Sequence, residues 1–150
     1  MKSVNVITTF IEKKREKQIK YEKSVLRDIS VKVLKERVQY YFGSSRFTQS
    51  MIMHSGIEEA CYDVAIEAFL LGANMSRFGY YGEEAQEVKL RCKPEEKHLI
   101  DTLYNFLLYW GSGQEGVLDE SLLYQCEQYV NSWWLDGFYK GEKRIKLKLH

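Results

Sequence analysis

The sequence predicts an all-α protein built as one bundle-like domain. Apolar residues recur at helical spacing in four long segments, and a single proline stands in the 150 residues. The hydrophobic fraction of 45% and the charged fraction of 29% suit one domain with one core. We expect four main helices and one short helix within 1–150: a long first helix over 10–42, a helical body over 55–139 and an extended basic tail over 140–150.

The first predicted helix is polar in its first half and amphipathic in its second. Thr9 and Glu12 have the spacing of a capping box, which predicts a helix start there. A continuous helix over 10–42 would span about 50 Å at ~1.5 Å per residue, more than the diameter of a compact domain of this size. Two alternatives remain open: the polar half projects from the domain, or the helix breaks near residues 28–30.

The helical body begins with a second capping box, formed by Ser55 and Glu58. This predicts a helix from Ser55 to about Arg77, with Gly79 as its left-handed terminator. The glycine-rich and aromatic turn that follows leads into a short helix over 83–91.

Two more long helices complete the predicted body. Pro94 has the place of a first helical residue, and the last helix opens near Asp119 and ends near Gly137 or Tyr139. Basic and apolar residues alternate over 144–149, which favours an extended segment on the surface. This alternation also fits contact with anionic lipid.

Charge is distributed unevenly along the chain. The total is +1, but residues 1–40 carry +6, residues 41–139 carry −9 and residues 140–150 carry +4. The total excludes a globally basic nucleic-acid coat. The split indicates either internal complementarity or a basic arm for an acidic partner, such as nucleic acid or an anionic membrane surface.

The candidate arm is a dense run of basic residues in the first helix. It consists of Lys13, Lys14, Arg15, Lys17, Lys20 and Lys23. Such a run can follow phosphates electrostatically, although no base-reading motif accompanies it.

A set of carboxylates and one histidine provides a metal-binding alternative. Its members are Glu59, Asp63 and Glu67, spaced by four, and Glu95 and His98, spaced by three. A Glu-x-x-His pair facing carboxylates holds two iron or manganese ions in ferritin-like bundles. That design needs two such pairs and this chain has one, and the helical wheel places both groups on solvent-facing sides. We therefore expect no cofactor and keep the metal site as an alternative.

The cysteines indicate a reducing compartment rather than catalysis. Three cysteines occur without a C-x-x-C pair. Cys61 and Cys126 belong to apolar stripes, where a small core residue is expected. Cys92 stands between Arg91 and Lys93 just before a helix, a setting that predicts a lowered thiol pKa. No catalytic set is apparent, so a non-enzymatic protein is favoured.

Aromatic residues, 14% of the chain, suggest contact surfaces. One candidate recognition turn contains Arg77, Phe78, Tyr80 and Tyr81, whose rings could alternatively plug the end of the bundle. The aromatic runs 40–42 and 133–134 place one ring off the main stripe, which predicts a second burial surface and favours self-association or a protein partner.

No targeting or membrane-spanning segment is evident. The longest apolar run, 65–73, is broken by Glu67, whereas a membrane span needs about 20 apolar residues. We expect a cytoplasmic protein without a transmembrane segment.

Three stretches resemble a family of small uncharacterised proteins of Bacillus-type bacteria. They are NVITTFIEKKREKQIKYEK, EEACYDVAIEAFLLGANMSRFGYYGE and EEKHLIDTLYNFLLYWG, and SRFGYYGE is the most specific piece. The family is YbaK-like, carries a domain-of-unknown-function label and is distinct from the tRNA-editing deacylase of the same name. The resemblance implies a cytosolic bacterial protein and no site residues. The favoured hypothesis is a non-enzymatic interaction, regulatory or structural factor that binds itself, as in a homodimer, or another protein.

Overall fold

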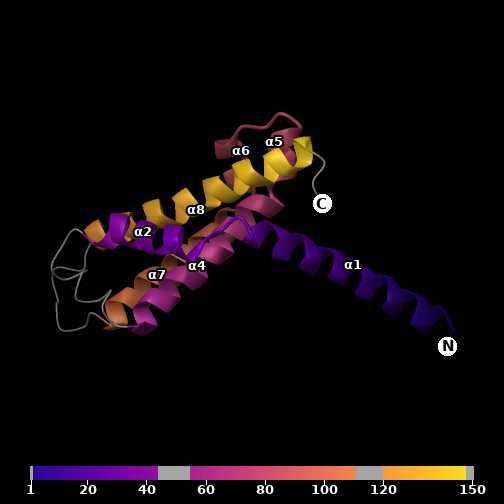
Figure 1. Ribbon diagram of the computed structural model, residues 1–150, viewed down its shortest axis with the longest axis horizontal. Coiled ribbons are helices and arrows are strands. Elements are labelled where there is room, and N and C mark those ends of the chain that lie inside the picture. Colours follow the sequence, from indigo (N-terminus) through magenta and orange to yellow (C-terminus); the bar gives the residue numbers. More distant parts are fainter. Residues whose placement is uncertain (1, 44–54, 111–119, 148–150) are drawn as a thin grey trace.

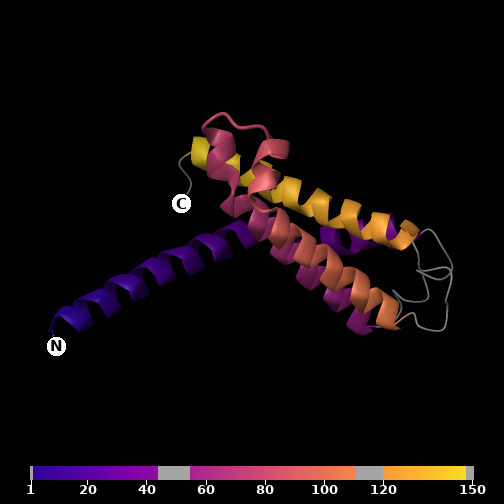
Figure 2. The ribbon, with the colours of Figure 1, turned by 180° about the vertical axis from the view of Figure 1, so that it is seen from behind.

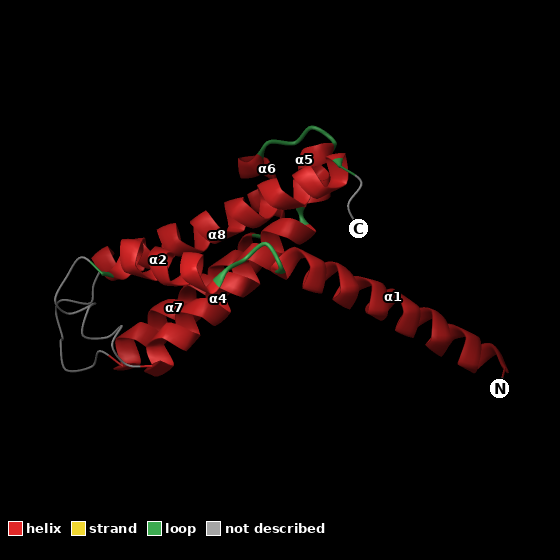
Figure 3. Ribbon diagram, in the orientation of Figure 1, coloured by secondary structure: helices red, strands yellow, loops and turns green. Residues whose placement is uncertain are grey.

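The computed structural model describes residues 2–43, 55–110 and 120–147, and these ranges contain helices and no strand (Figures 1 and 3). The helices are α1 (Lys2–Leu26), α2 (Val31–Phe42), α4 (Ser55–Asn74), α5 (Ser76–Tyr80), α6 (Ala85–Arg91), α7 (Lys93–Trp110) and α8 (Glu120–Lys146). The predicted all-α class is confirmed. The described ranges hold seven helices rather than the five expected, because two predicted helices are each divided.

The parallel pair α4 and α8 forms the centre of the body. The Tyr129 hydroxyl of α8 donates to the Cys61 carbonyl of α4 at 2.9 Å near one end of the contact. Farther along, the backbones approach so closely that a Cβ on Gly72 would meet the Trp134 carbonyl and a Cβ on Gly137 would meet the Phe69 carbonyl. The glycines therefore let two helix backbones touch.

The remaining body helices pack around this pair. Helix α7 lies against α4 and α8 (Figure 2), and α2 contacts α8 and α4. Their buried side chains, including Leu34, Val38, Leu103 and Leu107, join one large apolar cluster. This burial is the main driving force that holds the bundle together.

The adjacent residues Trp133 and Trp134 pack into two separate apolar clusters. Trp133 belongs to the large cluster, whereas Trp134 joins Val88 and Phe138 in a smaller cluster under α5 and α6. Both indole side chains are almost fully buried, and Trp134 stacks on Phe138 with ring centroids 5.1 Å apart. The second burial surface predicted for this doublet therefore lies within the chain rather than at a partner.

The long first helix both breaks and projects. Helix α1 ends at Leu26, and Ser30 starts α2 as its N-cap, with its Oγ accepting from the Val33 amide at 3.2 Å. Most of α1 extends away from the body, with the N-terminus at its far end (Figures 1 and 2). The expected start after Thr9 is wrong, because α1 begins at Lys2 and Thr9 lies inside it.

The predicted boundaries around α4 are partly correct. The start at Ser55 is confirmed, but α4 ends at Asn74 rather than near Arg77. Gly79 is not the terminator, because it lies inside the short helix α5. The left-handed residue is Gly82, with φ of 111°, a conformation that favours glycine.

The predicted extended tail is wrong over residues 140–146, which continue α8. Lys143, Arg144 and Lys146 lie in its last turn, where cations interact favourably with the negative end of the helix dipole. Gly137 and Tyr139 do not end the helix. Residues 148–150 of the predicted tail lie outside the described residues.

Candidate functional site

The basic arm is an exposed helix. Every residue from 9 to 20 is exposed, including Phe10 at 70%, Ile11 at 53% and Ile19 at 44% of their full surface. A helical segment without tertiary packing is marginal in water, because packing of an apolar face supplies most helical stability in proteins. A partner that covers these exposed apolar side chains would therefore stabilise this segment of α1.

The six predicted arm cations all lie in this exposed part or directly beside the body. None of Lys13, Lys14, Arg15, Lys17, Lys20 and Lys23 forms a salt bridge with a described residue. Over its 25 residues, α1 has seven basic and three acidic side chains, a net charge of +4. The arm thus presents free positive charge together with apolar surface.

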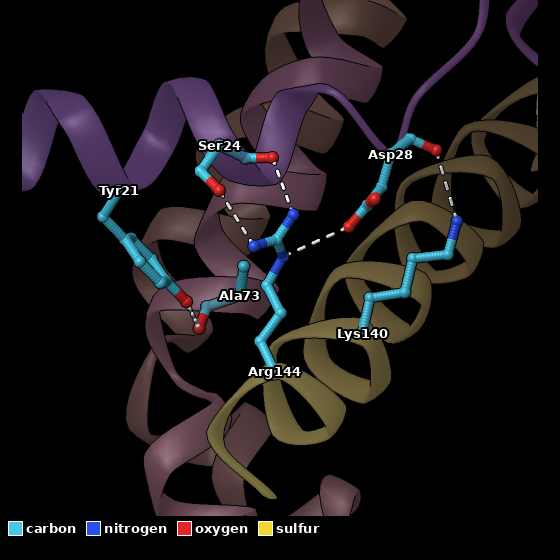
Figure 4. A network of polar contacts seen from close by, with 6 residues as sticks. All are labelled: Tyr21, Ser24, Asp28, Ala73, Lys140 and Arg144. Carbon is cyan, nitrogen blue, oxygen red and sulfur yellow. Dashed lines mark hydrogen bonds and ion pairs between the residues drawn. The ribbon is translucent and has the colours of Figure 1, made fainter. Parts of the chain in front are cut away.

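Arg144 of α8 fixes the joint between α1 and α2 (Figure 4). Its Nη2 donates to the Ser24 carbonyl at 2.8 Å, and its Nη1 donates to the Ser24 Oγ at 2.9 Å. Its Nε donates to Asp28 Oδ2 at 3.2 Å. One guanidinium therefore joins the last turn of α1 to the turn that follows, in a geometry that its planar fork favours.

Contacts from the body complete the joint. The Tyr21 hydroxyl donates to the Ala73 carbonyl at 3.2 Å, and Lys140 Nζ donates to the Asp28 carbonyl at 3.4 Å (Figure 4). Val25 is fully buried in the large cluster. The last turns of α1 are therefore held firmly, whereas residues 10–17 have no such contacts with the described body.

Sequence reasoning missed this role of Arg144. It assigned the residue to an extended tail that could contact lipid, whereas the side chain is 14% exposed and bonded to Ser24. Its bonding partners are more than a hundred residues away in sequence. No local pattern could have identified them.

The metal candidates lie on exposed surfaces of two helices. Glu59, Asp63 and Glu67 follow one ridge of α4, and Glu95 and His98 lie on α7, all with exposed side chains. Within residues 2–43, 55–110 and 120–147, no three or more His, Cys, Asp or Glu residues are grouped so that they could hold a metal ion. The described structure thus gives the ferritin-like alternative no support.

The candidate recognition turn divides into a buried part and an exposed part. Phe78 packs against the smaller core, with the Arg91 guanidinium 4.2 Å from its ring centroid and that of Arg77 at 5.0 Å. Tyr80 and Tyr81 are exposed, Tyr81 at 82%. The alternative that the rings plug the bundle therefore fits Phe78 and does not fit the two tyrosines.

The predicted lowering of the Cys92 pKa is wrong in direction. Its thiol is buried in the smaller core, and burial raises its pKa, with the Glu96 and Glu95 carboxylates acting in the same direction. Burial also raises the pKa of Cys61 to about 12, with Glu58 adding to the effect. Burial raises the pKa of Cys126 as well.

These thiols should be inert in the native protein. At pH 8 we expect a thiol-directed disulfide reagent to modify Cys61 about a thousandfold more slowly than a free cysteine, because so little thiolate forms and access is blocked. Cys92 and Cys126, whose pKa values are also raised by burial, should react more slowly than a free cysteine as well. The matched control is the same reaction in denaturant, where all three should react quickly. Rapid modification of Cys92 in the native chain would instead indicate a functional thiol.

Two neighbouring hollows of about 410 and 590 Å³ lie between α6, α7 and α8. They share Lys89, Glu96, Ile100 and Glu127. Lys89 Nζ lies 3.0 Å from Glu96 Oε1, so this central pair is internally neutralised. The first hollow is lined by three lysines and three acidic residues, which indicates no preference for an anion or a cation.

Comparison with known proteins matches nearly the whole chain. The family model described as "Protein of unknown function (DUF2521)" matches residues 4–150. The chain belongs to this DUF2521 family. It is also 31% identical over 144 residues to the "Uncharacterized protein YbaK" of Bacillus subtilis (strain 168), covering 95% of this chain and 97% of that protein. No solved structure matches.

The family assignment confirms the resemblance to uncharacterised proteins of Bacillus-type bacteria. None of the helices over the described residues of this DUF2521 protein has the length and apolarity that a membrane crossing requires. The candidate functional surface is the arm with the joint that aims it, because the arm exposes apolar and basic side chains together.

Proposed function

We propose that this DUF2521 protein is a non-enzymatic protein-interaction factor that binds its partner through α1. The observation that carries the proposal is the exposure of Phe10, Ile11 and Ile19 on a helix that the body aims but does not cover. Exposed aromatic and aliphatic side chains of a helix are typical anchors for helix-mediated binding. The unpaired cations select a partner with an acidic surface.

The cytoplasm is the location that this proposal assigns to the protein. Its three cysteines are free and buried, as suits a reducing compartment. An RNA or DNA partner is the alternative, since six unpaired cations would release counterions on binding phosphates. Protein is favoured because the arm combines those cations with exposed apolar side chains, and because the described residues include no base-reading motif.

Site-specific photo-crosslinking in living cells tests the proposal. Phe10 is replaced by benzoylphenylalanine, and Tyr124, a 62% exposed residue of α8, receives the same replacement as the matched control. We expect protein adducts at position 10 and few or none at position 124. Adducts containing nucleic acid, or equal labelling at both positions, would contradict a protein-binding arm. A crosslinked species of twice the chain mass would identify the partner as a second copy.

A further inference from the structure

We propose that the partner is a second copy of this chain, and that α1 of each copy lies along the acidic face of α4 of the other. This inference rests on the proposed function of α1 and names its binding surface. Helices α1 and α4 diverge from the joint at residues 18–28, leaving an open angle between them (Figures 1 and 2). In a two-fold dimer, α1 of each copy would enter the angle between α1 and α4 of the other copy, so that the same contact forms twice.

The face of α1 that packs on α4 continues beyond the contact. Gln18 Nε2 donates to Asn74 Oδ1 at 3.2 Å, and Tyr21 and Val25 contact the body. The alternating spacing of three and four that joins these residues extends to Lys14 and Ile11, which lie on the same side of the helix. A surface that packs against α4 at one end is thus uncovered at the other.

The face of α4 that receives α1 also continues beyond the contact. From Asn74, residues spaced by three or four run back through Leu70, Glu67, Asp63 and Glu59. The three acidic residues are exposed, and Leu70 is half-buried beside them. The uncovered part of α4 therefore carries negative charge next to apolar surface.

The two faces are complementary in charge. The α4 face carries Glu59, Asp63 and Glu67, and the α1 face carries Lys14, with Lys17 beside it. Over the whole helices the net charge is −4 for α4 and +4 for α1. Two α1 helices alone would repel one another, whereas an α1 helix laid on the α4 helix of another copy pairs opposite charges. This argument favours the reciprocal α1–α4 contact over a simple pairing of two arms.

Charge exchange between two variants tests the contact. The first variant is Lys14→Glu with Lys17→Glu, and the second is Asp63→Lys with Glu67→Lys; all four side chains are exposed, so both variants should fold. Sedimentation velocity should show a dimer for the parent chain. Each variant alone should lose at least about tenfold in dimer affinity, because like charges then meet at both copies of the contact.

An equimolar mixture of the two variants should recover the dimer. In that mixture both reciprocal contacts again join opposite charges. The matched control is Lys32→Glu with Lys35→Glu on α2, two exposed cations outside the contact. It should dimerise alone and fail to rescue the second variant.

The outcomes separate this inference from the proposed function. A parent chain that stays monomeric overturns the inference, while crosslinks from position 10 to a different protein would still support the arm. A dimer that survives both charge reversals, or a mixture without rescue, also overturns the α1–α4 contact. If a variant loses both the dimer and part of its helical circular dichroism signal, the equimolar mixture decides the question. Only folded chains can recover the dimer, so rescue in the mixture supports the α1–α4 contact.

Discussion

Replacing Gly137 by alanine should destabilise the protein by about 3 kcal/mol, lowering Tm by roughly 9 °C for a chain of this length. The added methyl group would meet the backbone of Phe69 on α4, which cannot rotate away as a side chain would. The two central helices must therefore separate, which loosens the packing of the large core on both sides of the contact.

Gly56→Ala is the matched control for this prediction. It is the same substitution in α4, at an exposed position where the new Cβ would meet nothing within 4 Å. Alanine is a better helix former, so stability should stay the same or rise by about 0.5 kcal/mol. Thermal and denaturant unfolding of both variants measures the difference. Equal stabilities would mean that α4 and α8 do not approach as closely as the structure places them.

Gly137 also illustrates what the sequence could and could not predict. Apolar spacing predicted the long helices because that periodicity is local, and it placed Cys61 and Cys126 on stripes that are buried. A glycine inside such a pattern is ambiguous, since it fits a helix end and a close contact equally well. Which of the two applies at Gly137 depends on its contact with Phe69, which lies 68 residues earlier in the chain.

The sequence predicted which residues make up the candidate site but not how they are arranged in space. The basic run of α1 could be found by counting charges, and its exposure is what the structure adds. The acidic residues Glu59, Asp63 and Glu67 were expected to face solvent and were considered only for an alternative metal site, because spacing alone does not reveal what faces them. They share a face of α4 with Asn74, and only the hydrogen bond from Gln18 to Asn74, a tertiary contact, shows that this face meets α1.

Replacing Arg144 by alanine should lower the free energy of unfolding by about 2 kcal/mol and free α1 to change direction. The substitution removes charge-assisted hydrogen bonds to Ser24 and Asp28. Arg144→Lys should recover part of the stability, since an ammonium keeps the charge without the planar fork. Lys143→Ala, an exposed neighbour on α8, should change stability by less than about 0.5 kcal/mol.

The direction of the arm can be measured separately from stability. Spin labels at Lys20→Cys and Glu127→Cys, both exposed positions, report the distance from α1 to α8 when the labelled chain is diluted with unlabelled chain. We expect one narrow distance distribution in the parent and a broad one with Arg144→Ala. An unchanged narrow distribution would show that Tyr21 and Val25 aim the arm without the guanidinium. A broad distribution together with weaker dimerisation would tie the joint to binding, because an arm that must be ordered on contact loses affinity to conformational entropy.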